Sequence, residues 1–267
     1  MRFGLLQMLS LEPQSAKSDV LHLEGLDNAQ RAAVLKPAVV PVMILAPPGS
    51  GKTTTLCYRI GKLICSDGVR PARILAVTFS NKACRDMKLK LSKLALEAGM
   101  SSIAEVPVRT FHGWALGVLQ QFNALPPDVS IWDARLSLCA CKLALAQYAA
   151  DTGDNTLITA RQVAKNAKYY LTLMTRLRMR LVGTEQLLAD TPMREVWTRY
   201  VAVKQACNAI DFDDMLEFVI KAAYAHNGLK TFLLEAYDCL VVDEVRLHVF
   251  WHSSVLVCSF RTPTNSS

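Results

Sequence analysis

The residues best suited to chemistry stand together in one short loop near the start of the chain. The run from residue 46 to residue 53 reads Ala-Pro-Pro-Gly-Ser-Gly-Lys-Thr, which fits the phosphate-binding pattern of Gly or Ala, four residues, then Gly-Lys-Thr. In this pattern the glycines let several backbone N–H groups turn toward one anion. Lys52 is expected to reach the β- and γ-phosphates, and the Thr53 hydroxyl is expected to bind Mg²⁺. The expected ATP contacts in and beside the loop are Ala46, Pro47, Pro48, Gly49, Ser50, Gly51, Lys52, Thr53 and Thr54.

The segments on either side of this loop match what a phosphate site requires. Residues 42–45 form a short apolar run, Val-Met-Ile-Leu, which is typical of a buried strand. After the loop, apolar residues recur at helical spacing at Leu56, Cys57, Ile60, Leu63 and Ile64. A helix that begins at the loop adds partial positive charge next to the phosphates. The alternative is a glycine turn followed by a chance Lys-Thr pair, and the strand–loop–helix order argues against it.

A second set of chemically capable residues lies far along the chain. Residues 239–242 are apolar and predict a buried strand that ends at the acids Asp243 and Glu244. In a nucleotide hydrolase Asp243 would hold Mg²⁺ through water, and Glu244 would orient or deprotonate the attacking water. An apolar run before two acids is common by itself. Combined with Lys52 and Thr53, it predicts a catalytic set of Lys52, Asp243 and Glu244.

Composition limits the class of protein. A length of 267 residues allows one large domain or two small ones, and 51% hydrophobic residues argue against a disordered chain. A net charge of +7 and a pI of about 9.0 suit an acidic partner, with nucleic acid the first choice. The eight cysteines include no Cys-x-x-Cys pair, which argues against a zinc site and favours reduced thiols in the nucleus or cytoplasm. Neither a secretory signal nor a membrane-spanning stretch of about 18 apolar residues is expected, although an organelle is not excluded.

Two further strands are expected between the loop and the acids. Residues 73–78 predict a buried strand, followed by a helix that begins near Asn81 and turns Met87, Leu91 and Leu94 inward. Residues 105–113 predict a third strand that ends in Thr-Phe-His-Gly. Aromatic residues at the carboxyl ends of strands in an open α/β sheet lie where such sheets bind ligands.

At these points the chain resembles the UvrD/Rep-type DNA helicases of superfamily 1. Leu-Asp-Asn-Ala-Gln at 26–30 is similar to the family's Q motif, although Asp27 stands where Asn is usual. Residues 76–83 are similar to motif Ia, and residues 110–113 are similar to motif Ib. The resemblance implies an α/β fold, a RecA-like P-loop NTPase lobe with a parallel sheet and an all-helical insertion. It also implies that Gln30 reads the adenine edge.

The resemblance further implies a track for single-stranded DNA, with duplex DNA as a second partner. Phe79 can stack on a base, and Asn81 and Lys82 can bond to phosphate. The alternative is that Phe79 and Phe111 are ordinary core residues. The expected DNA-binding residues are Thr78, Phe79, Ser80, Asn81, Lys82, Thr110, Phe111 and His112.

The middle of the chain lacks strand signals. Helical patterns cover about 133–150, 159–180 and 192–209, so residues 126–210 are expected to be the helical insertion. Asp211 is expected to cap a helix that turns Phe212 inward and ends at Asn227-Gly228. The expected divisions are an N-terminal extension at 1–24, the lobe at 25–125, the insertion at 126–210, the return to the lobe at 211–244 and an atypical tail at 245–267.

The resemblance stops after Glu244. The family continues with Gln two residues after the acids, whereas this chain has Val245 followed by Arg246. We interpret the tail as a splice form or a gene-model artefact, with a genuine tail as the alternative. We expect the second motor lobe to come from a missing C-terminal part or a partner. One lobe alone is expected to bind nucleotide without unwinding DNA, because the arginines that assist phosphoryl transfer belong to the second lobe. Two alternatives stay open: an inactive or regulatory ATP- and DNA-binding fragment, and a P-loop small-molecule kinase.

Overall fold

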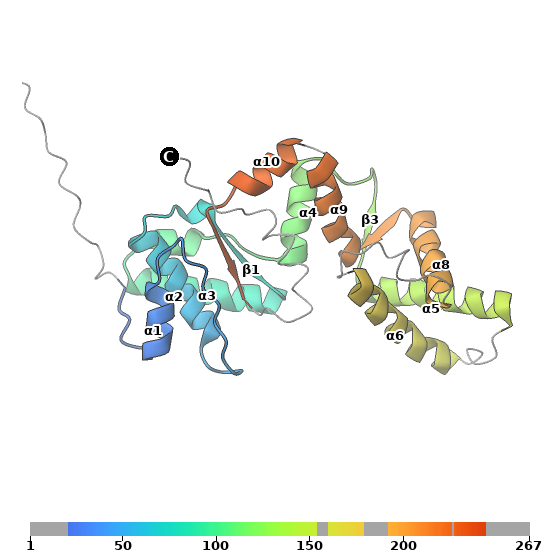
Figure 1. The fold of residues 1–267 in the computed structure, drawn as a ribbon, viewed down its shortest axis with the longest axis horizontal. Helices are drawn as coiled ribbons and strands as arrows, with labels where there is room; N and C mark the ends of the chain where they lie inside the picture. The colour runs from blue at the N-terminus through green and yellow to red at the C-terminus, as the bar shows by residue number, and fades with distance from the viewer. Residues whose placement is uncertain (1–20, 154–159, 179–191, 226, 244–267) are drawn as a thin grey trace, which may run out of the picture. The chain divides into compact units, whose positions relative to one another are not determined.

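The computed structural model describes residues 21–153, 160–178, 192–225 and 227–243 (Figure 1). These residues form two compact units. The first unit takes the described part of residues 1–72 together with 87–106. The second takes 73–86 and the described residues from 107 onward. Glu244 and the tail lie outside the described residues.

The first unit is helical and contains the phosphate loop. Helix α1 (Asn28–Leu35) is followed by α2 (Lys52–Cys65), by most of α3 (Asn81–Glu97) and by the short helix η2 (Ser101–Glu105). Asp27 begins α1 with a capping box. The buried faces of α2 and α3 carry Ile60, Leu63, Met87, Leu91 and Leu94, which confirms the helical spacing seen in the sequence.

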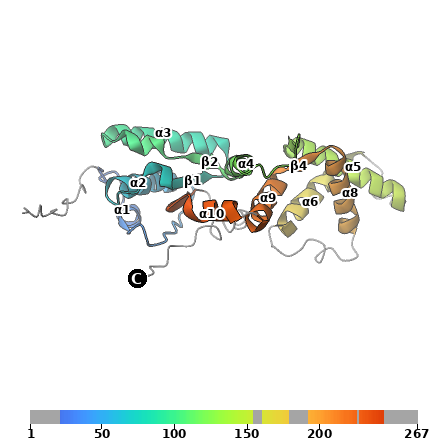
Figure 2. The same cartoon turned by 90° about the horizontal axis from the view of Figure 1, so that it is seen from above.

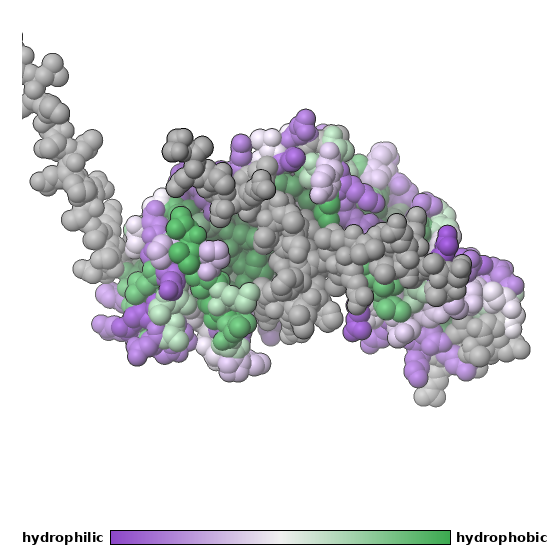
Figure 3. All heavy atoms as spheres, viewed as in Figure 1, coloured by the Kyte–Doolittle hydropathy of each residue, from purple (hydrophilic) through white to green (hydrophobic). Residues whose placement is uncertain are grey.

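The predicted strand at 42–45 is wrong in this structure. Residues 41–47 have no assigned strand or helix, and the side chains of Met43 and Leu45 are 76% and 86% exposed. Figure 3 shows hydrophobic surface over the region where α1 and α2 lie. An apolar run specifies a tendency to be buried, but a strand also needs a neighbouring strand edge for its N–H and C=O groups. Among the described residues, no strand pairs with this segment.

The second unit contains a three-stranded parallel sheet with the order β2-β1-β5. After the short helix η1 (Pro71–Arg73), strand β1 (Ile74–Thr78) pairs with β2 (Val108–Thr110) on one side and with β5 (Cys239–Val242) on the other. Thr78 is opposite Thr110, and Val77 is opposite Val242. The three strands therefore end at the same edge of the sheet, which is the predicted parallel arrangement.

Three helices of the second unit pack against this sheet or each other. Helix α4 (Phe111–Gln121) contacts α9 (Phe212–Ala225), and α9 contacts α10 (Asn227–Glu235). Their shared core includes Leu75, Val77, Trp114, Leu119, Met215, Leu216 and Leu233. The expected helix end at Asn227-Gly228 is wrong, because α10 begins at Asn227. Asn is tolerated at helix starts as well as ends, so the dipeptide alone does not show whether a helix begins or ends there.

The segment predicted to be helical has its own core. Helix α5 (Ala134–Thr152) packs against α6 (Ala160–Arg178) and α8 (Pro192–Ala206), and the three gather in one group in Figure 2. Cys141, Leu145, Met174, Val196 and Tyr200 fill the space between them.

The all-helical interpretation of this segment needs one correction. Strand β3 (Ser130–Trp132) pairs in parallel with β4 (Ala209–Asp211) near the two ends of the segment. Three residues are too few for alternating apolar and polar positions to register as a strand pattern. In the part of the chain that the structure describes, none of the helices is both long and apolar enough to cross a bilayer.

Candidate functional site

The phosphate loop, residues 46–53, has the backbone of an anion cradle. Gly49 and Gly51 have φ angles of +81° and +79°, a left-handed region that residues with a side chain seldom adopt. Helix α2 begins directly after them at Lys52. The Lys52 ammonium donates to the carbonyl oxygens of Ala46 at 2.8 Å and Pro47 at 2.7 Å, so it lies over the loop. The predicted loop and the helix that follows it are confirmed.

Polar atoms around the loop fit a phosphate ligand. The Ser50 hydroxyl oxygen is buried, and it makes no hydrogen bond within the described residues. A buried hydroxyl without a partner is costly, and an anionic oxygen would satisfy it. The Thr54 hydroxyl accepts a hydrogen bond from the Lys90 ammonium of α3 at 3.1 Å, which adds another cation next to the expected nucleotide contacts.

Gln30 of α1 lies directly against the phosphate loop. Its Nε2 donates to the Ser50 carbonyl at 3.0 Å, and its Oε1 accepts from the Asp27 backbone N–H at 3.1 Å. A Cβ added to Gly51 would lie 3.0 Å from that same Nε2, so a side chain there would displace the Gln30 amide. The structure thus brings together two motifs that are twenty positions apart in the sequence.

In the second unit, the residues after β1 are exposed where DNA binding was predicted. Thr78 itself is buried, and its hydroxyl donates to the Ser80 carbonyl at 3.2 Å. Phe79 is 49% exposed, and Asn81 and Lys82 are also exposed. Phe79 is therefore available to stack on a ligand, whereas Thr78 shapes the backbone of the strand end.

The residues after β2 divide between core and surface. Phe111 is 2% exposed and packs in the core, so its ring does not reach a ligand here, in contrast to the predicted stacking role. The physical reason is that the chain turns into α4 at Phe111, where Thr110 caps the helix by accepting from the Gly113 N–H at 3.0 Å. The predicted strand end is therefore a helix start.

Phe212 is a surface residue that the sequence interpretation placed in the core. Its side chain is 39% exposed, and its ring stacks on His112 with centroids 4.9 Å apart and planes tilted by 30°. Burial lowers the pKa of His112, against an opposing effect of Asp211, so the imidazole is neutral at pH 7. Helical spacing relative to Met215 and Leu216 suggested an inward position, but Phe212 is the first residue of α9 and its ring extends over α4's start instead.

The first acid of the predicted pair lies at the same sheet edge. Asp243 directly follows β5, and its backbone N–H donates to the Val77 carbonyl at 2.9 Å. Its side chain is 3% exposed. The second acid, Glu244, lies outside the described residues. The parallel register thus places Asp243 and the Phe79 segment after neighbouring strands.

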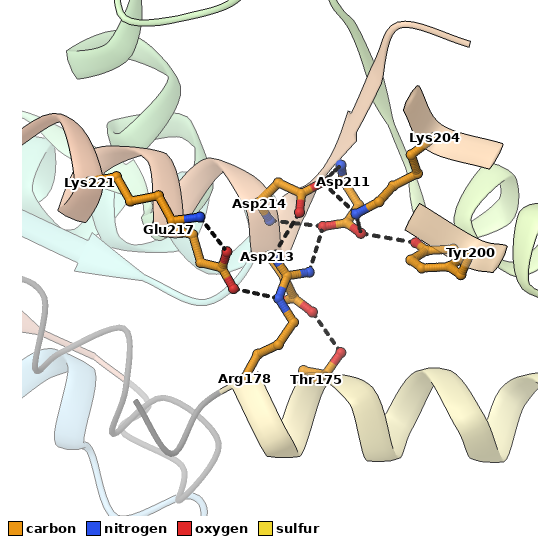
Figure 4. A network of polar contacts seen from close by, with 9 residues as sticks. All are labelled: Thr175, Arg178, Tyr200, Lys204, Asp211, Asp213, Asp214, Glu217 and Lys221. Carbon is orange, nitrogen blue, oxygen red and sulfur yellow. Dashed lines mark hydrogen bonds and ion pairs between the residues drawn. The ribbon is translucent and has the colours of Figure 1, made fainter. Parts of the chain in front are cut away.

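A buried ion-pair network fixes the start of α9 next to Phe212 (Figure 4). The guanidinium of Arg178, at the end of α6, pairs with Asp211 at 3.3 Å, Asp214 at 2.7 Å and Glu217 at 2.7 Å. The ammonium of Lys204, on α8, pairs with Asp211 at 2.7 Å and Asp214 at 2.6 Å. Both cations are at most 6% exposed. Hence one cluster ties α6 and α8 to the junction of β4 and α9.

The network keeps the Asp211 carboxylate ionised and fixes its position. Burial opposes ionisation of Asp211, but Lys204 and Arg178 outweigh it and lower the pKa of this carboxyl to about 2. Asp211 and Asp214 also accept from each other's backbone N–H groups at 2.8 Å, which fixes the first turn of α9. No local pattern marks Arg178 or Lys204 as core residues, because Arg and Lys are almost never fully buried unless paired.

Comparisons with known proteins agree with the motifs. Residues 26–245 match the UvrD/REP helicase N-terminal domain. The chain is 30% identical over 249 residues to ATP-dependent DNA helicase UvrD2 of Mycobacterium tuberculosis, an alignment that covers 86% of this chain and 34% of the relative. It is 29% identical over 223 residues to ATP-dependent DNA helicase PcrA of Leuconostoc citreum, with 82% and 29% covered.

A third relative gives a similar result. Identity to ATP-dependent DNA helicase UvrD1 of Mycobacterium tuberculosis is 28% over 245 residues, which covers 87% of this chain and 30% of the relative. The chain thus spans about a third of the length of these curated relatives. Since the family match extends over most of the sequence, the chain belongs to the UvrD/REP helicase N-terminal domain family.

Proposed function

We propose that this chain binds MgATP on its phosphate loop and single-stranded DNA at the strand ends of its sheet, as the N-terminal motor lobe of an ATP-dependent DNA helicase. The observation that carries the proposal is the phosphate loop itself. Two left-handed glycines, the Lys52 ammonium over the loop and the start of α2 together form an anion cradle. The helicase names of the relatives support DNA as the second ligand.

Each part of the nucleotide has a proposed contact. Lys52 and the loop N–H groups bind the β- and γ-phosphates, and Gln30 reads the adenine edge from its place beside Ser50. Each of the two proposed Mg²⁺ ligands, Thr53 and Asp243, carries an oxygen atom of the kind that Mg²⁺ prefers. Glu244 is proposed to orient the attacking water, as expected from its place after Asp243 in the sequence.

For DNA, the exposed aromatic residues supply stacking surfaces. Phe79 follows β1, and Phe212 with His112 forms a partly exposed aromatic pair at the starts of α9 and α4. Bases of any sequence can stack on such rings, while Asn81 and Lys82 can bond to the phosphates. Separation of duplex DNA needs this lobe together with a second lobe. ATP hydrolysis drives strand separation, and in ATPases an arginine from outside the phosphate loop assists phosphoryl transfer.

Alanine at Phe79 or at Phe212 is expected to weaken binding of oligothymidine by about 1–3 kcal/mol each, the usual contribution of one stacked base. The physical reason is loss of a ring that is exposed and positioned at a strand or helix end. Fluorescence anisotropy with labelled oligothymidine measures the effect. Affinity should also fall steeply with added salt, because phosphate contacts release counterions.

Tyr224 gives a matched control for this experiment. It is an aromatic residue of the same helix α9, it is 85% exposed, and it stands near the opposite end from Phe212. Tyr224→Ala should leave oligothymidine affinity unchanged. Equal losses for all three variants, or no loss at Phe79 and Phe212, would contradict the proposed DNA surface.

A further inference from the structure

Arg59 is a buried arginine on the phosphate-loop helix, and its partners are backbone carbonyls at one end of α1. The side chain is 8% exposed. Its Nη1 donates to the Val34 carbonyl at 2.9 Å and to the Lys36 carbonyl, and its Nη2 donates to the Pro37 carbonyl at 2.8 Å. One guanidinium therefore bonds three carbonyls at the C-terminal end of α1 and in the turn that follows.

The chemistry of this contact is specific to arginine. The last carbonyls of a helix have no partner within the helix, and they carry the negative end of its dipole. The planar guanidinium presents several N–H groups in a fixed arrangement, so one side chain can satisfy several carbonyls at once. Lysine at this place would keep the charge but has a single donor atom on a flexible stem.

The opposite end of α1 carries Gln30. That residue bonds the phosphate loop through the Ser50 carbonyl, and the loop continues into α2 at Lys52. Arg59 stands seven positions after Lys52 on the same helix, which is about two turns. Helix α1 is thus attached to the loop by Gln30 at its start and to α2 by Arg59 at its end.

We propose that Arg59 is a positioning residue for nucleobase recognition. By bonding the end of α1, it fixes the distance and angle at which Gln30 stands over the phosphate loop. It thereby sets the preference of the site for an adenine nucleotide over a bare polyphosphate. This inference rests on the proposed role of Gln30 in reading adenine, and it adds a residue that lies two helical turns from the loop.

The test compares ATP with inorganic tripolyphosphate, both with Mg²⁺, by isothermal titration of the full chain. Tripolyphosphate carries the phosphate charges without ribose or base, so the ratio of the two dissociation constants reports recognition of the nucleoside, and the change of this ratio in Gln30→Ala reports the part that Gln30 contributes. Arg59→Lys and Gln30→Ala should each weaken ATP binding by about threefold to tenfold, the range for loss of one neutral hydrogen bond. Both should leave the tripolyphosphate affinity unchanged.

Cys57→Ala is the matched control for loss of stability. Cys57 is buried on α2, and its Sγ lies 4.0 Å from the Met87 carbonyl oxygen of α3. This variant should lower the unfolding temperature and keep the wild-type ratio of dissociation constants. An altered ratio in both Arg59→Lys and Cys57→Ala would mean that stability alone is involved, and would overturn the inference.

The remaining outcomes distinguish a failure of the inference about Arg59 from a failure of the proposed role of Gln30. If Gln30→Ala loses the preference for ATP while Arg59→Lys retains it, Gln30 reads the base and Arg59 does not position it. If Gln30→Ala keeps the wild-type preference, the adenine role of Gln30 is wrong, and the inference about Arg59 falls with it. A loss of preference in Gln30→Ala and Arg59→Lys, with Cys57→Ala unchanged, supports the inference.

Discussion

Lys52→Ala is expected to lower the affinity of the chain for MgATP by more than about tenfold, since a hydrogen bond to a charged group contributes roughly 1.5–3 kcal/mol. The ammonium lies over the loop, bonded to the carbonyls of Ala46 and Pro47, and is placed to exchange these for phosphate oxygens. The substitution removes the one side-chain cation of the loop and leaves both glycines unchanged. Titration with a fluorescent ATP analogue measures the loss.

Lys62→Ala is the matched control for Lys52→Ala. Lys62 is a lysine of the same helix, and its ammonium pairs with Asp67 at 2.6 Å near the C-terminal end of α2. Removing that charge changes the net charge by the same amount without touching the loop. Equal ATP affinities in Lys52→Ala and wild type would show that the loop does not bind the nucleotide.

Arg178→Met is expected to lower the free energy of unfolding by about 3–5 kcal/mol, the usual cost of removing one partner from a buried ion pair. The guanidinium pairs with Asp211, Asp214 and Glu217, and its removal leaves these carboxylates with too little positive charge in a buried site. Urea denaturation at pH 7 measures the loss. Arg199→Met is the control, because Arg199 pairs with Asp151 and Glu195 at the surface, where such pairs contribute less than about 1 kcal/mol.

The loss of stability in Arg178→Met is expected to depend on pH. In wild type, the pKa of Asp211 is lowered to about 2, so its contribution to stability is present above its ordinary pKa and is lost as the pH falls from about 4 toward 2. Without Arg178 the folded-state pKa of Asp211 rises, and protonation relieves the unpaired charge. The stability difference between wild type and Arg178→Met should therefore shrink as the pH is lowered from 7 to 4. An equal loss in Arg178→Met and Arg199→Met would contradict the structural role of the network.

The sequence predicted the phosphate loop and the helix that follows it, because their chemistry is local. The glycine pattern, the helix that begins at Lys52 and the buried strand β1 each follow from residues within a few positions of one another. The structure adds a capping box of Asp27 and Gln30, which is also local because it lies within four residues. The parallel register of β1 and β5 places Asp243 directly after a strand that neighbours β1.

Features that depend on distant partners could not be predicted in this way. The run at 42–45 has the composition of a strand, but pairing depends on a neighbouring edge that composition does not specify. Phe212 and Phe111 are both aromatic residues at helix starts, and only the packing distinguishes the exposed ring from the buried one. Arg59 and Arg178 are each buried against partners from another helix, so no local spacing identifies them.

Hydrogen exchange of backbone amides in the full chain, with and without MgATP, tests the central claim most directly. The phosphate loop predicts slower exchange at the N–H groups of Gly49, Ser50, Gly51, Lys52 and Thr53 when MgATP is bound, because these groups would donate to phosphate oxygens. Unchanged exchange across residues 46–53 at a concentration of MgATP that saturates the chain would contradict the account, because the nucleotide would then bind elsewhere.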